Sequence, residues 1–229
     1  GRIDAADAEL SAHVGLTAGR VRLAGFSSAI GSLVPRAAAA LASRHPGLQI
    51  SLTDTHPPDA IELLRTGKIE VAIIFRYDET DPEPDGVRLH HLLDDPVYLL
   101  SARRERTLAA LRDATWIAGC DRCRSHLLSL CADEGYEPRI GYISDDMVVM
   151  QALVAAGLGV TTIPGLALRA HRAEGIVASE LPGSQRHVYA ATYGEPPDPP
   201  ATAALLAALA EAATSATSAE VTSSVTRAL

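Results

Sequence analysis

The chain has 229 residues, 47% of them hydrophobic, so it can bury a substantial core as one large or two small domains. Its net charge of −8 argues against a self-sufficient nucleic-acid-binding module, which would present a basic face to phosphate. No apolar run reaches the roughly 20 residues of a membrane-spanning helix, and three cysteines do not suggest a disulfide scaffold. Because the N-terminus also lacks an apolar signal core, we expect a cytoplasmic protein.

The first part of the chain alternates strand and helix patterns after a polar helix at 4–14 and a linker at 15–19. Apolar runs rich in β-branched residues predict strands, and apolar residues at helical spacing predict helices. The predicted elements are a strand at 21–26, a helix at 29–44 capped by Ser27 or Ser28, a strand at 48–54, a helix at 58–66 and a buried strand at 71–74. This order predicts a parallel sheet.

A polar loop at 77–86 leads into a second α/β unit. The predicted elements that follow are strands at 87–93, 96–101 and 116–119, a helix at 124–134, a strand at 139–143, the segment 144–164, and strands at 176–181 and 186–193. A proline-rich turn at 195–200 precedes a final helix at 201–213. The Ser-, Thr- and Ala-rich tail at 214–229 is predicted to be disordered.

Residues 144–164 are the most informative segment of the second unit. Ser144 or Asp145 is expected to cap a helix whose apolar residues recur at helical spacing, and Gly157 is expected to end it. A short strand and a second helix, which starts near Pro164, follow. Helix N-termini present N–H groups that can hold an anion, so this segment predicts one wall of a ligand site.

Two successive α/β units with a closing helix predict two lobes. Ligands of open α/β sheets bind outside the carboxyl ends of the strands. Where two such lobes meet, these ends can face one another, so we expect a ligand cleft between the lobes.

Motifs in the first lobe resemble those of one known family. Residues 15–23 (Gly-Leu-Thr-Ala-Gly-Arg-Val-Arg-Leu) resemble the end of a linker helix and the first strand of that family. Residues 33–35 (Leu-Val-Pro), together with residues 44–48 (Arg-His-Pro-Gly-Leu), resemble its first helix and the exit from that helix.

Two further motifs follow in the expected order. Residues 63–73 resemble the family pattern LxxGxlDlai, with Glu70 where aspartate is usual. Residues 153–164 resemble the pattern LVaaGlGiallP. Over about residues 10–212, the chain therefore resembles the effector-binding half of LysR-type transcriptional regulators.

The resemblance implies the type 2 periplasmic-binding-protein fold, an α/β fold of two Rossmann-like lobes with a ligand cleft between them. Lobe I would comprise residues 20–94 and 194–213, and lobe II residues 95–193. Residues 1–19 would be the end of a linker helix and a linker. The family also implies an N-terminal winged helix-turn-helix domain that is absent from this chain, so DNA would be bound only through that missing domain.

The resemblance also implies a homodimer or homotetramer, with a small-molecule effector, no cofactor and no membrane partner. The expected dimer faces are the helix at 29–44 with the strand at 48–54, and the helix at 124–134 with the strand at 139–143. The side chains expected to line the first of these faces are Leu33, Ala37, Ala40 and Leu41.

Helix N-termini and backbone N–H groups of the cleft would hold the effector. The candidate ligand residues of lobe I are Ser27, Ser28, Thr55, His56, Pro57 and Arg76. Those of lobe II are Gly119, Cys120, Asp121, Arg122, Ser144 and Asp145. The residues at helix starts have plain capping as an alternative, and Arg76 could pair with Asp78 or Glu79 instead of a ligand carboxylate. Arginine and helix ends together favour an anionic effector.

The cysteines of lobe II suggest two further hypotheses. Cys120, Cys123, His126 and Cys131 are of metal-ligand type, but two of the cysteines are expected about two turns apart on one helix, which argues against a tetrahedral metal site. Peroxide-sensing members of the family keep a reactive cysteine pair in this region, so redox sensing through Cys120, Cys123 and Cys131 is an alternative. Ordinary buried or cleft-lining thiols are the favoured interpretation.

Two other function classes are alternatives to an effector-sensing regulator. A solute-binding protein of a transporter would have the same fold. An enzyme is not expected, because the sequence has no GxSxG, no HExxH, no phosphate loop and no nucleophile with an obvious base.

Overall fold

The computed structural model describes residues 19–77, 84–103 and 107–226, with side chains described as far as Ala216. The predicted helix at 4–14 lies outside these residues. The described residues form two compact units: unit 1 contains those up to 94 and from 187 onwards, and unit 2 contains those from 95 to 186. The chain re-enters unit 1 between Arg186 and His187. The predicted boundary between lobe II and lobe I lay later in the chain, between residues 193 and 194.

Unit 1 is built on a parallel sheet. β1 (Gly19–Gly25) lies between β2 (Leu48–Asp54) and β3 (Val71–Arg76), and both pairings are parallel. The predicted β-α-β-α-β order is thus confirmed. β8 (Val177–Tyr193) adds to β3 in the antiparallel direction, with Arg76 opposite His187.

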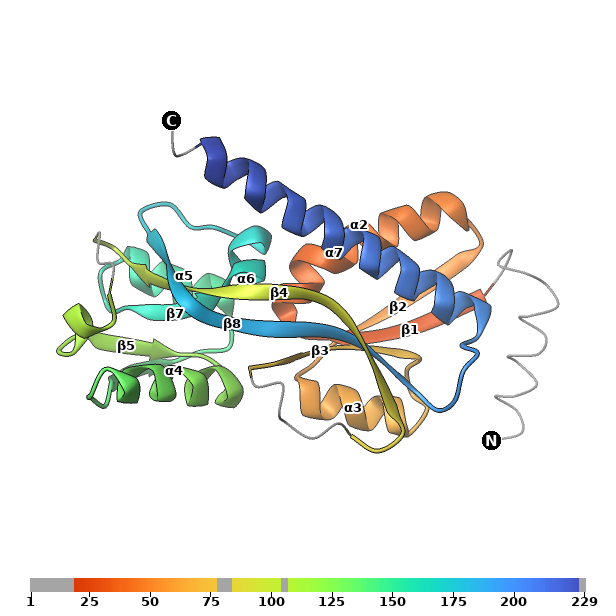
Figure 1. The fold of residues 1–229 in the computed structure, drawn as a ribbon, viewed down its shortest axis with the longest axis horizontal. Coiled ribbons are helices and arrows are strands. Elements are labelled where there is room, and N and C mark those ends of the chain that lie inside the picture. Colours follow the sequence, from red (N-terminus) through yellow and green to blue (C-terminus); the bar gives the residue numbers. More distant parts are fainter. Residues whose placement is uncertain (1–18, 78–83, 104–106, 227–229) are drawn as a thin grey trace. The chain divides into compact units, whose positions relative to one another are not determined.

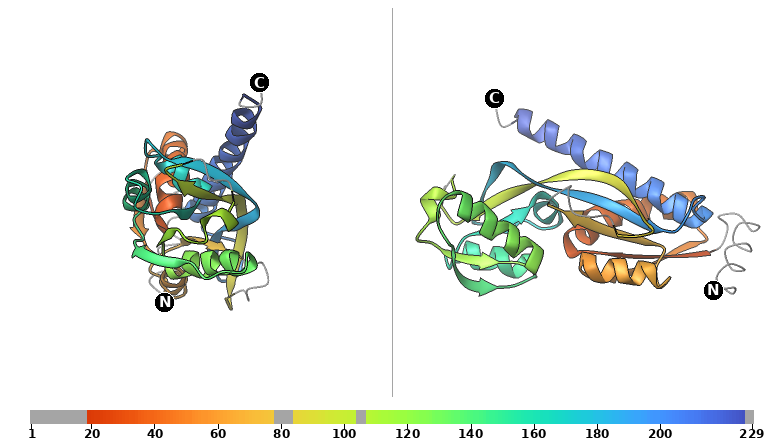
Figure 2. Two further views of the ribbon diagram at one scale, coloured as in Figure 1. Left: turned by 90° about the vertical axis from the view of Figure 1, so that its left-hand side faces the viewer. Right: turned by 60° about the horizontal axis from the view of Figure 1, so that its bottom comes forward.

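Helices cover both faces of this sheet (Figures 1 and 2). α2 (Ser27–Arg44) and α7 (Pro200–Thr226) pack together on one face, and α3 (Pro57–Arg65) covers the other. The apolar side of α3 contributes Ala60 and Leu64 to a buried cluster with Ala72 and Ile74 of β3. Because β3 is covered on both faces, all six of its residues are buried.

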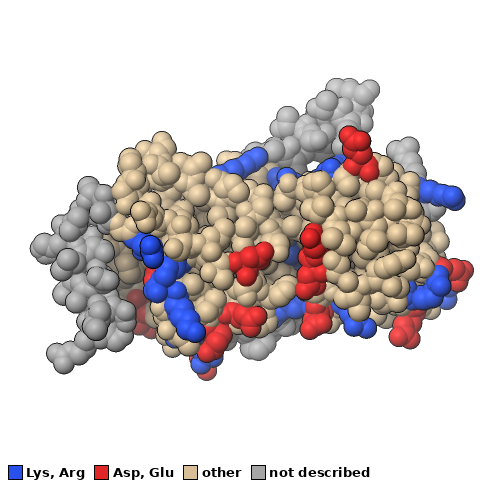
Figure 3. Space-filling model, turned by 180° about the vertical axis from the view of Figure 1, so that it is seen from behind, with Lys and Arg blue, Asp and Glu red and all other residues tan. Residues whose placement is uncertain are grey.

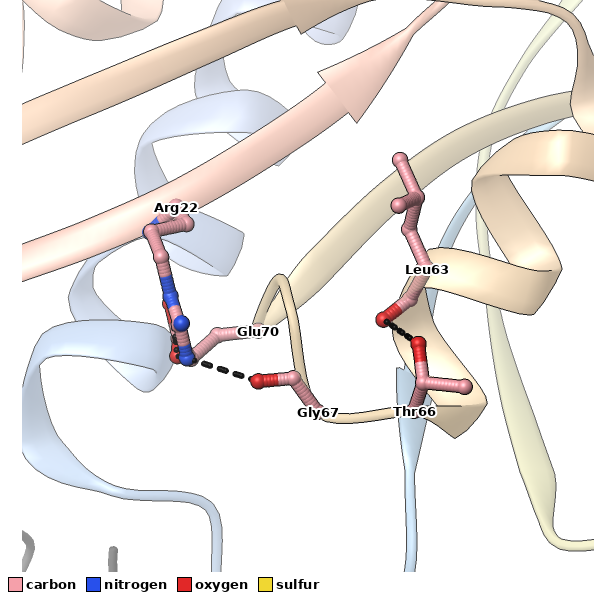
Figure 4. Close-up of polar contacts among 5 residues, drawn as sticks. All are labelled: Arg22, Leu63, Thr66, Gly67 and Glu70. Carbon is pink, nitrogen blue, oxygen red and sulfur yellow. Dashed lines mark hydrogen bonds and ion pairs between the residues drawn. The ribbon is translucent and has the colours of Figure 1, made fainter.

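An ion pair joins the α3–β3 turn to β1 (Figure 4). The Arg22 guanidinium donates to the carboxylate of Glu70, with Nε 3.0 Å from Oε1, and to the backbone carbonyl of Gly67 at 2.9 Å. The backbone N–H of Arg22 also donates to Glu70 Oε2. The carboxylate at position 70 therefore bonds both the backbone and the side chain of β1, and this role accounts for an acidic residue directly before β3.

Unit 2 contains a second, smaller parallel pair, β5 (Thr115–Ala118) and β6 (Arg139–Ile143). α4 (Asp121–Asp133) packs on β5, and a single bridge joins Trp116 to Val160. The further helices of the unit are the 3-10 turn η2 (Ala109–Leu111), α5 (Met147–Ala155) and α6 (Gly165–Ala170). β7 (Thr161–Pro164) pairs antiparallel with β4 (Val87–Ser101).

The predicted core face of α5 is largely confirmed. Met150 and Val154 are buried and join a cluster that includes Ile117 and Ile163. Gln151, a polar residue on the same helix, is fully buried. Its side-chain amide donates to a backbone carbonyl at 3.0 Å and accepts from the Ala173 N–H at 2.9 Å, so it holds the segment that follows α6.

Two strand predictions were wrong in the same way. The predicted strands at 87–93 and 96–101 form the single strand β4, and those at 176–181 and 186–193 form the single strand β8. Pro96 precedes the first β4–β7 pair, so its missing N–H removes no bond from that ladder. Gly183 has a φ of +75° within β8, so the Pro-Gly sequence there bends the strand without ending it.

The predicted helix caps were also wrong. The N-cap of α2 is Phe26, and Ser27 and Ser28 lie in the first turn. The N-cap of α5 is Asp146, whose carboxylate accepts from the N–H groups of Val148 and Val149. These N–H groups lie two and three residues beyond the cap, which is the reach of a capping carboxylate.

The final helix is longer than predicted, because α7 continues to Thr226 through the stretch predicted to be a disordered tail. Alanine is the strongest helix former, and Ala213 and Ala216 are buried, so this stretch has both the propensity and the packing to be helical. Among the described residues, no helix is both long and apolar enough to cross a membrane.

The predicted dimer-face residues of α2 need a correction. Leu33, Ala37 and Leu41 are buried inside the chain, with 2% exposure or less, and Ala40 is partly buried. α2 packs against α7, so its apolar side is already covered within one chain.

A buried ion pair stabilises unit 2. Asp95 of β4 and Arg186 of β8 are each 2% exposed, and Arg186 Nε lies 2.9 Å from Asp95 Oδ2. The other carboxylate oxygen accepts from the Leu166 N–H at 2.8 Å, in the first turn of α6. Asp95 therefore joins two strands and a helix start within one unit.

Replacing Asp95 by alanine should strongly destabilise the protein, because it leaves Arg186 charged and buried without its partner. Breaking a buried pair in this way typically costs about 3–5 kcal/mol. Urea unfolding followed by circular dichroism measures the loss. Glu211→Ala is the control, because it breaks the exposed pair with Arg44 and should change the unfolding midpoint little. Equal effects of the two substitutions would contradict this role of Asp95.

Candidate ligand-binding site

The carboxyl ends of β1, β2 and β3 bring the predicted residues of unit 1 to one edge of the sheet. β1 leads directly into Ser27 and Ser28, β2 leads into Thr55 and His56, and β3 ends at Arg76. Since parallel neighbours end at the same edge, this clustering follows from the topology. The Thr55 N–H donates to the Gly25 carbonyl at 2.9 Å, which ties the β2 exit to the β1 exit.

The two serines at the start of α2 differ in their surroundings. Ser28 is 4% exposed, whereas Ser27 is half-buried and its hydroxyl lies 3.3 Å from both carboxylate oxygens of Asp54. The first turn of α2 contains no acidic residue, and its Ala29 and Ile30 N–H groups donate to the Phe26 carbonyl at 3.0 and 3.1 Å. The positive end of the helix dipole at this start favours a negatively charged group nearby.

The residues that follow β2 differ from one another in exposure. Thr55 is half-buried, His56 is exposed, and Pro57 is buried as the first residue of α3. Pro57 has no N–H and can contribute only apolar contact.

Arg76 brings a positive charge to this edge from a buried position. It is 7% exposed at the end of β3. Phe75 beside it makes edge-to-face contacts with Phe26 at 4.9 Å and with Tyr77 at 5.7 Å between ring centroids. An arginine in such surroundings is a strong partner for a carboxylate, because the charge is poorly screened by water.

Unit 2 repeats the arrangement with β5 and β6. β5 ends at Ala118 and is followed by Gly119 and Cys120, the N-cap of α4. The Ser144 N–H donates to the Ala118 carbonyl at 3.0 Å, so the exits of the two strands lie together. Four of the predicted residues at these strand exits have polar side chains: Asp121, Arg122, Ser144 and Asp145. All of them are exposed except the half-buried Ser144.

The three cysteines have two kinds of environment. Cys120 and Cys123 are half-buried at the start of α4, with their Sγ atoms 3.2 Å apart. Cys131 is buried farther along the helix, and burial raises the pKa of its thiol. His126 lies 2.9 Å from the Ser184 hydroxyl, and burial lowers the pKa of its imidazole. The four side chains are thus divided among separate partners.

The sequence reasoning missed Asp54 and Asp146. Asp54 ends β2 and contacts Ser27, and Asp146 caps α5. Asp146 had a readable signal, because it directly precedes the apolar helical pattern. Asp54 had none, since its contact with Ser27 depends on the parallel pairing of β1 with β2.

Comparison with known proteins identifies the family. The model of the LysR substrate binding domain matches residues 15–214. The HTH-type transcriptional regulator TfdS of Cupriavidus pinatubonensis (strain JMP 134 / LMG 1197) is 27% identical over 157 residues, which cover 64% of this chain and 52% of TfdS. The chain spans about half the length of the curated relatives it matches.

Solved structures share the fold. The effector binding domain of BenM with its effector benzoate has a TM-score of 0.71 at 17% identity, covering 84% of this chain and 90% of that domain. The effector binding domain of QuiR in complex with shikimate has a TM-score of 0.71 at 19% identity, covering 86% and 98%. With most of its length matched by the family model, the chain belongs to the family of LysR substrate binding domains.

Proposed function

We propose that this domain binds a small anionic effector, most simply a carboxylate, at the carboxyl edge of β1–β3. The observation that carries the proposal is the buried Arg76 at the same sheet edge as the start of α2. A guanidinium can hold a carboxylate through two parallel hydrogen bonds. The positive end of a helix dipole can stabilise the negative charge of the same carboxylate. Benzoate and shikimate, the ligands named for BenM and QuiR, both carry a carboxylate.

Asp54 limits where the anion can sit. Its carboxylate already accepts from Ser27, and its negative charge would repel an anion placed against that hydroxyl. The favoured position is therefore nearer to Arg76 and Ser28. Asp54 could instead accept a hydrogen bond from a hydroxyl elsewhere on the effector.

The remaining predicted residues are proposed as secondary contacts. Thr55 and His56 in unit 1 offer side-chain hydrogen bonds, and Pro57 offers apolar contact. In unit 2, the backbone at Gly119 and Cys120 and the side chains of Ser144 and Asp145 stand at equivalent strand exits. Asp121 and Arg122 are exposed on the first turn of α4, and of these two only Arg122 suits an anion.

Replacing Arg76 by glutamine should weaken binding of a carboxylate effector by about 10- to 100-fold, since a hydrogen bond to a charged group contributes roughly 1.5–3 kcal/mol. Thermal-shift screening of small carboxylates, including benzoate and shikimate, finds the effector, and isothermal titration calorimetry gives the dissociation constants. Ser28→Ala, which keeps the charge, should weaken binding less.

Arg36→Gln is the matched control, because it removes an arginine from an exposed position on α2. It should leave the affinity unchanged. If Arg76→Gln and Arg36→Gln bind the effector equally well and both are folded, the proposed site is wrong. If only neutral ligands bind, the effector is not an anion.

We also propose a homodimer formed through the outer strands β2 and β6. Each lies at the end of its sheet, and large apolar side chains stand exposed on them: Leu52 at 46%, Tyr142 at 38% and Ile143 at 66%. Exposed apolar residues on an unpaired strand edge favour association. The proposed contact is therefore on the strands and not on the apolar side of α2.

Replacing Ile143 by glutamate should shift the protein towards monomer, because it puts a charge into the proposed interface. Analytical ultracentrifugation at several concentrations measures the equilibrium. Leu158→Glu is the control, since Leu158 is 47% exposed between α5 and β7. A dimer that is equally strong in both variants would exclude β6 from the interface.

Regulation of transcription requires contact with DNA, and we infer that residues outside this domain make that contact. The chain carries a net charge of −8. On the face shown in Figure 3, acidic and basic side chains are interspersed over the described residues without a broad basic surface. Such a surface is poorly suited to phosphate.

The family comparison does not favour the redox alternative, and alkylation can test the environments of the three thiols. We expect alkylation of the native protein to modify Cys120 and Cys123 faster than Cys131, because Cys131 has no exposed surface and its pKa is raised by burial. Mass spectrometry after timed treatment with iodoacetamide measures the rates, and denatured protein provides the control with equal access. Fast modification of Cys131 in the native state would contradict its burial.

A further inference from the structure

Three side chains of unit 1 that are of metal-ligand type lie close together. They belong to the parts of β4 and β8 that lie in unit 1, near the residues where the chain passes to unit 2. His91 and Asp94 belong to β4, and His187 belongs to β8. Asp94 Oδ1 lies 2.8 Å from His91 Nε2 and 2.8 Å from His187 Nδ1. The three ligand atoms all lie within 4.8 Å of one another, and this is the one such group of three among the described residues.

The contact between His91 and Asp94 is unusual for a strand. Residues three apart on a regular strand point to opposite faces, yet these two side chains meet. The Asp94 carboxylate also meets His187 of the neighbouring strand β8. The convergence therefore depends on the pairing of β4 with β8, and sequence spacing alone would not reveal it.

The ligand set matches a known coordination pattern. Two imidazoles and one carboxylate can occupy one face of a divalent transition-metal ion and leave positions for water. Metal–ligand distances of about 2.0–2.2 Å place ligand atoms about 3–3.5 Å apart around the ion. The two measured separations of 2.8 Å need only a small expansion to reach that range.

The three side chains differ in exposure to water. His187 is largely buried, with 14% of its side chain exposed, so its orientation is held by the protein. His91 and Asp94 are about half exposed, which lets an ion enter from water. The His91 ring also packs edge-to-face against Tyr189 of β8, with 5.5 Å between ring centroids. One ligand is thus held rigidly and two can adjust.

A nearby charge acts in the opposite direction. Arg76 lies opposite His187 in the β3–β8 register, and its positive charge would disfavour a cation. Imidazole nitrogens bind Ni²⁺, Cu²⁺ and Zn²⁺ better than Mn²⁺, and such ions tolerate this repulsion best.

We propose that His91, Asp94 and His187 form a binding site for a divalent transition-metal ion of the Zn²⁺ or Ni²⁺ type. The ion would link β4 to β8 close to the points where the chain passes between units 1 and 2, after Asp94 and before His187. The site is distinct in its residues from the proposed effector site and does not depend on it.

The test uses the whole chain without a purification tag, in a Cys120→Ser, Cys123→Ser background, so that thiolates cannot hold the ion. Titration with Ni²⁺ and Zn²⁺ by isothermal calorimetry should show one site per chain. The absorption spectrum of bound Co²⁺ should be that of nitrogen and oxygen ligands, without thiolate charge transfer. The ion should raise the melting temperature, and a chelator should reverse the rise.

His187→Ala and Asp94→Asn should each weaken metal binding by more than the roughly 10- to 100-fold loss that a missing outer-shell partner causes. His90→Ala is the matched control: His90 is adjacent to His91 on β4 but lies near the Thr192 hydroxyl, and its loss should leave metal affinity unchanged. Arg76→Gln should tighten metal binding, because it removes the opposing charge.

No saturable binding to the folded protein, or equal affinity of His90→Ala and His187→Ala, would overturn the proposal. Asp94→Asn keeps the size of the side chain, so it remains informative if His187→Ala does not fold. Effector affinity is measured separately, so failure here leaves the effector proposal standing.

Discussion

The buried pair of Asp95 and Arg186 is the constraint on which unit 2 depends. Neither charge can be solvated, so each requires the other. The pair joins β4 to β8, and the second oxygen of Asp95 holds the start of α6. Both β4 and β8 remain continuous strands at the residues where the two units divide.

Alternation along these strands gives their two faces different roles. Successive residues point to opposite faces, so Asp95 and Arg186 are buried while their neighbours Asp94 and His187 meet on the other side. One face thus contains the buried ion pair, and the other contains the contact between Asp94 and His187. His91 joins this contact although regular alternation would place it on the opposite face from Asp94.

The proposed effector site depends on a different rule, which is that parallel strands end at a common edge. β1, β2 and β3 place Ser28, Thr55 and Arg76 together although these residues are far apart in the sequence. The Arg22–Glu70 pair supports this sheet from its opposite end, near the start of β3. Because Arg76 is buried and Asp54 is exposed at the same edge, the local charge favours an anion beside the arginine and opposes it beside Ser27.

The sequence by itself determined the family, the parallel order of β1–β3 and the strand exits that carry the predicted ligand residues, because hydrophobic periodicity and turn residues are local signals. It misplaced the caps at Phe26 and Asp146 by one or two residues and divided β4 and β8 at proline and glycine. Only the tertiary structure decided that Leu33 and Leu41 are buried within the chain, and that Gln151 is a buried polar residue that holds a neighbouring segment. Only it brought His91, Asp94 and His187 together, because contacts between distant segments depend on strand pairing and register, which no local pattern encodes.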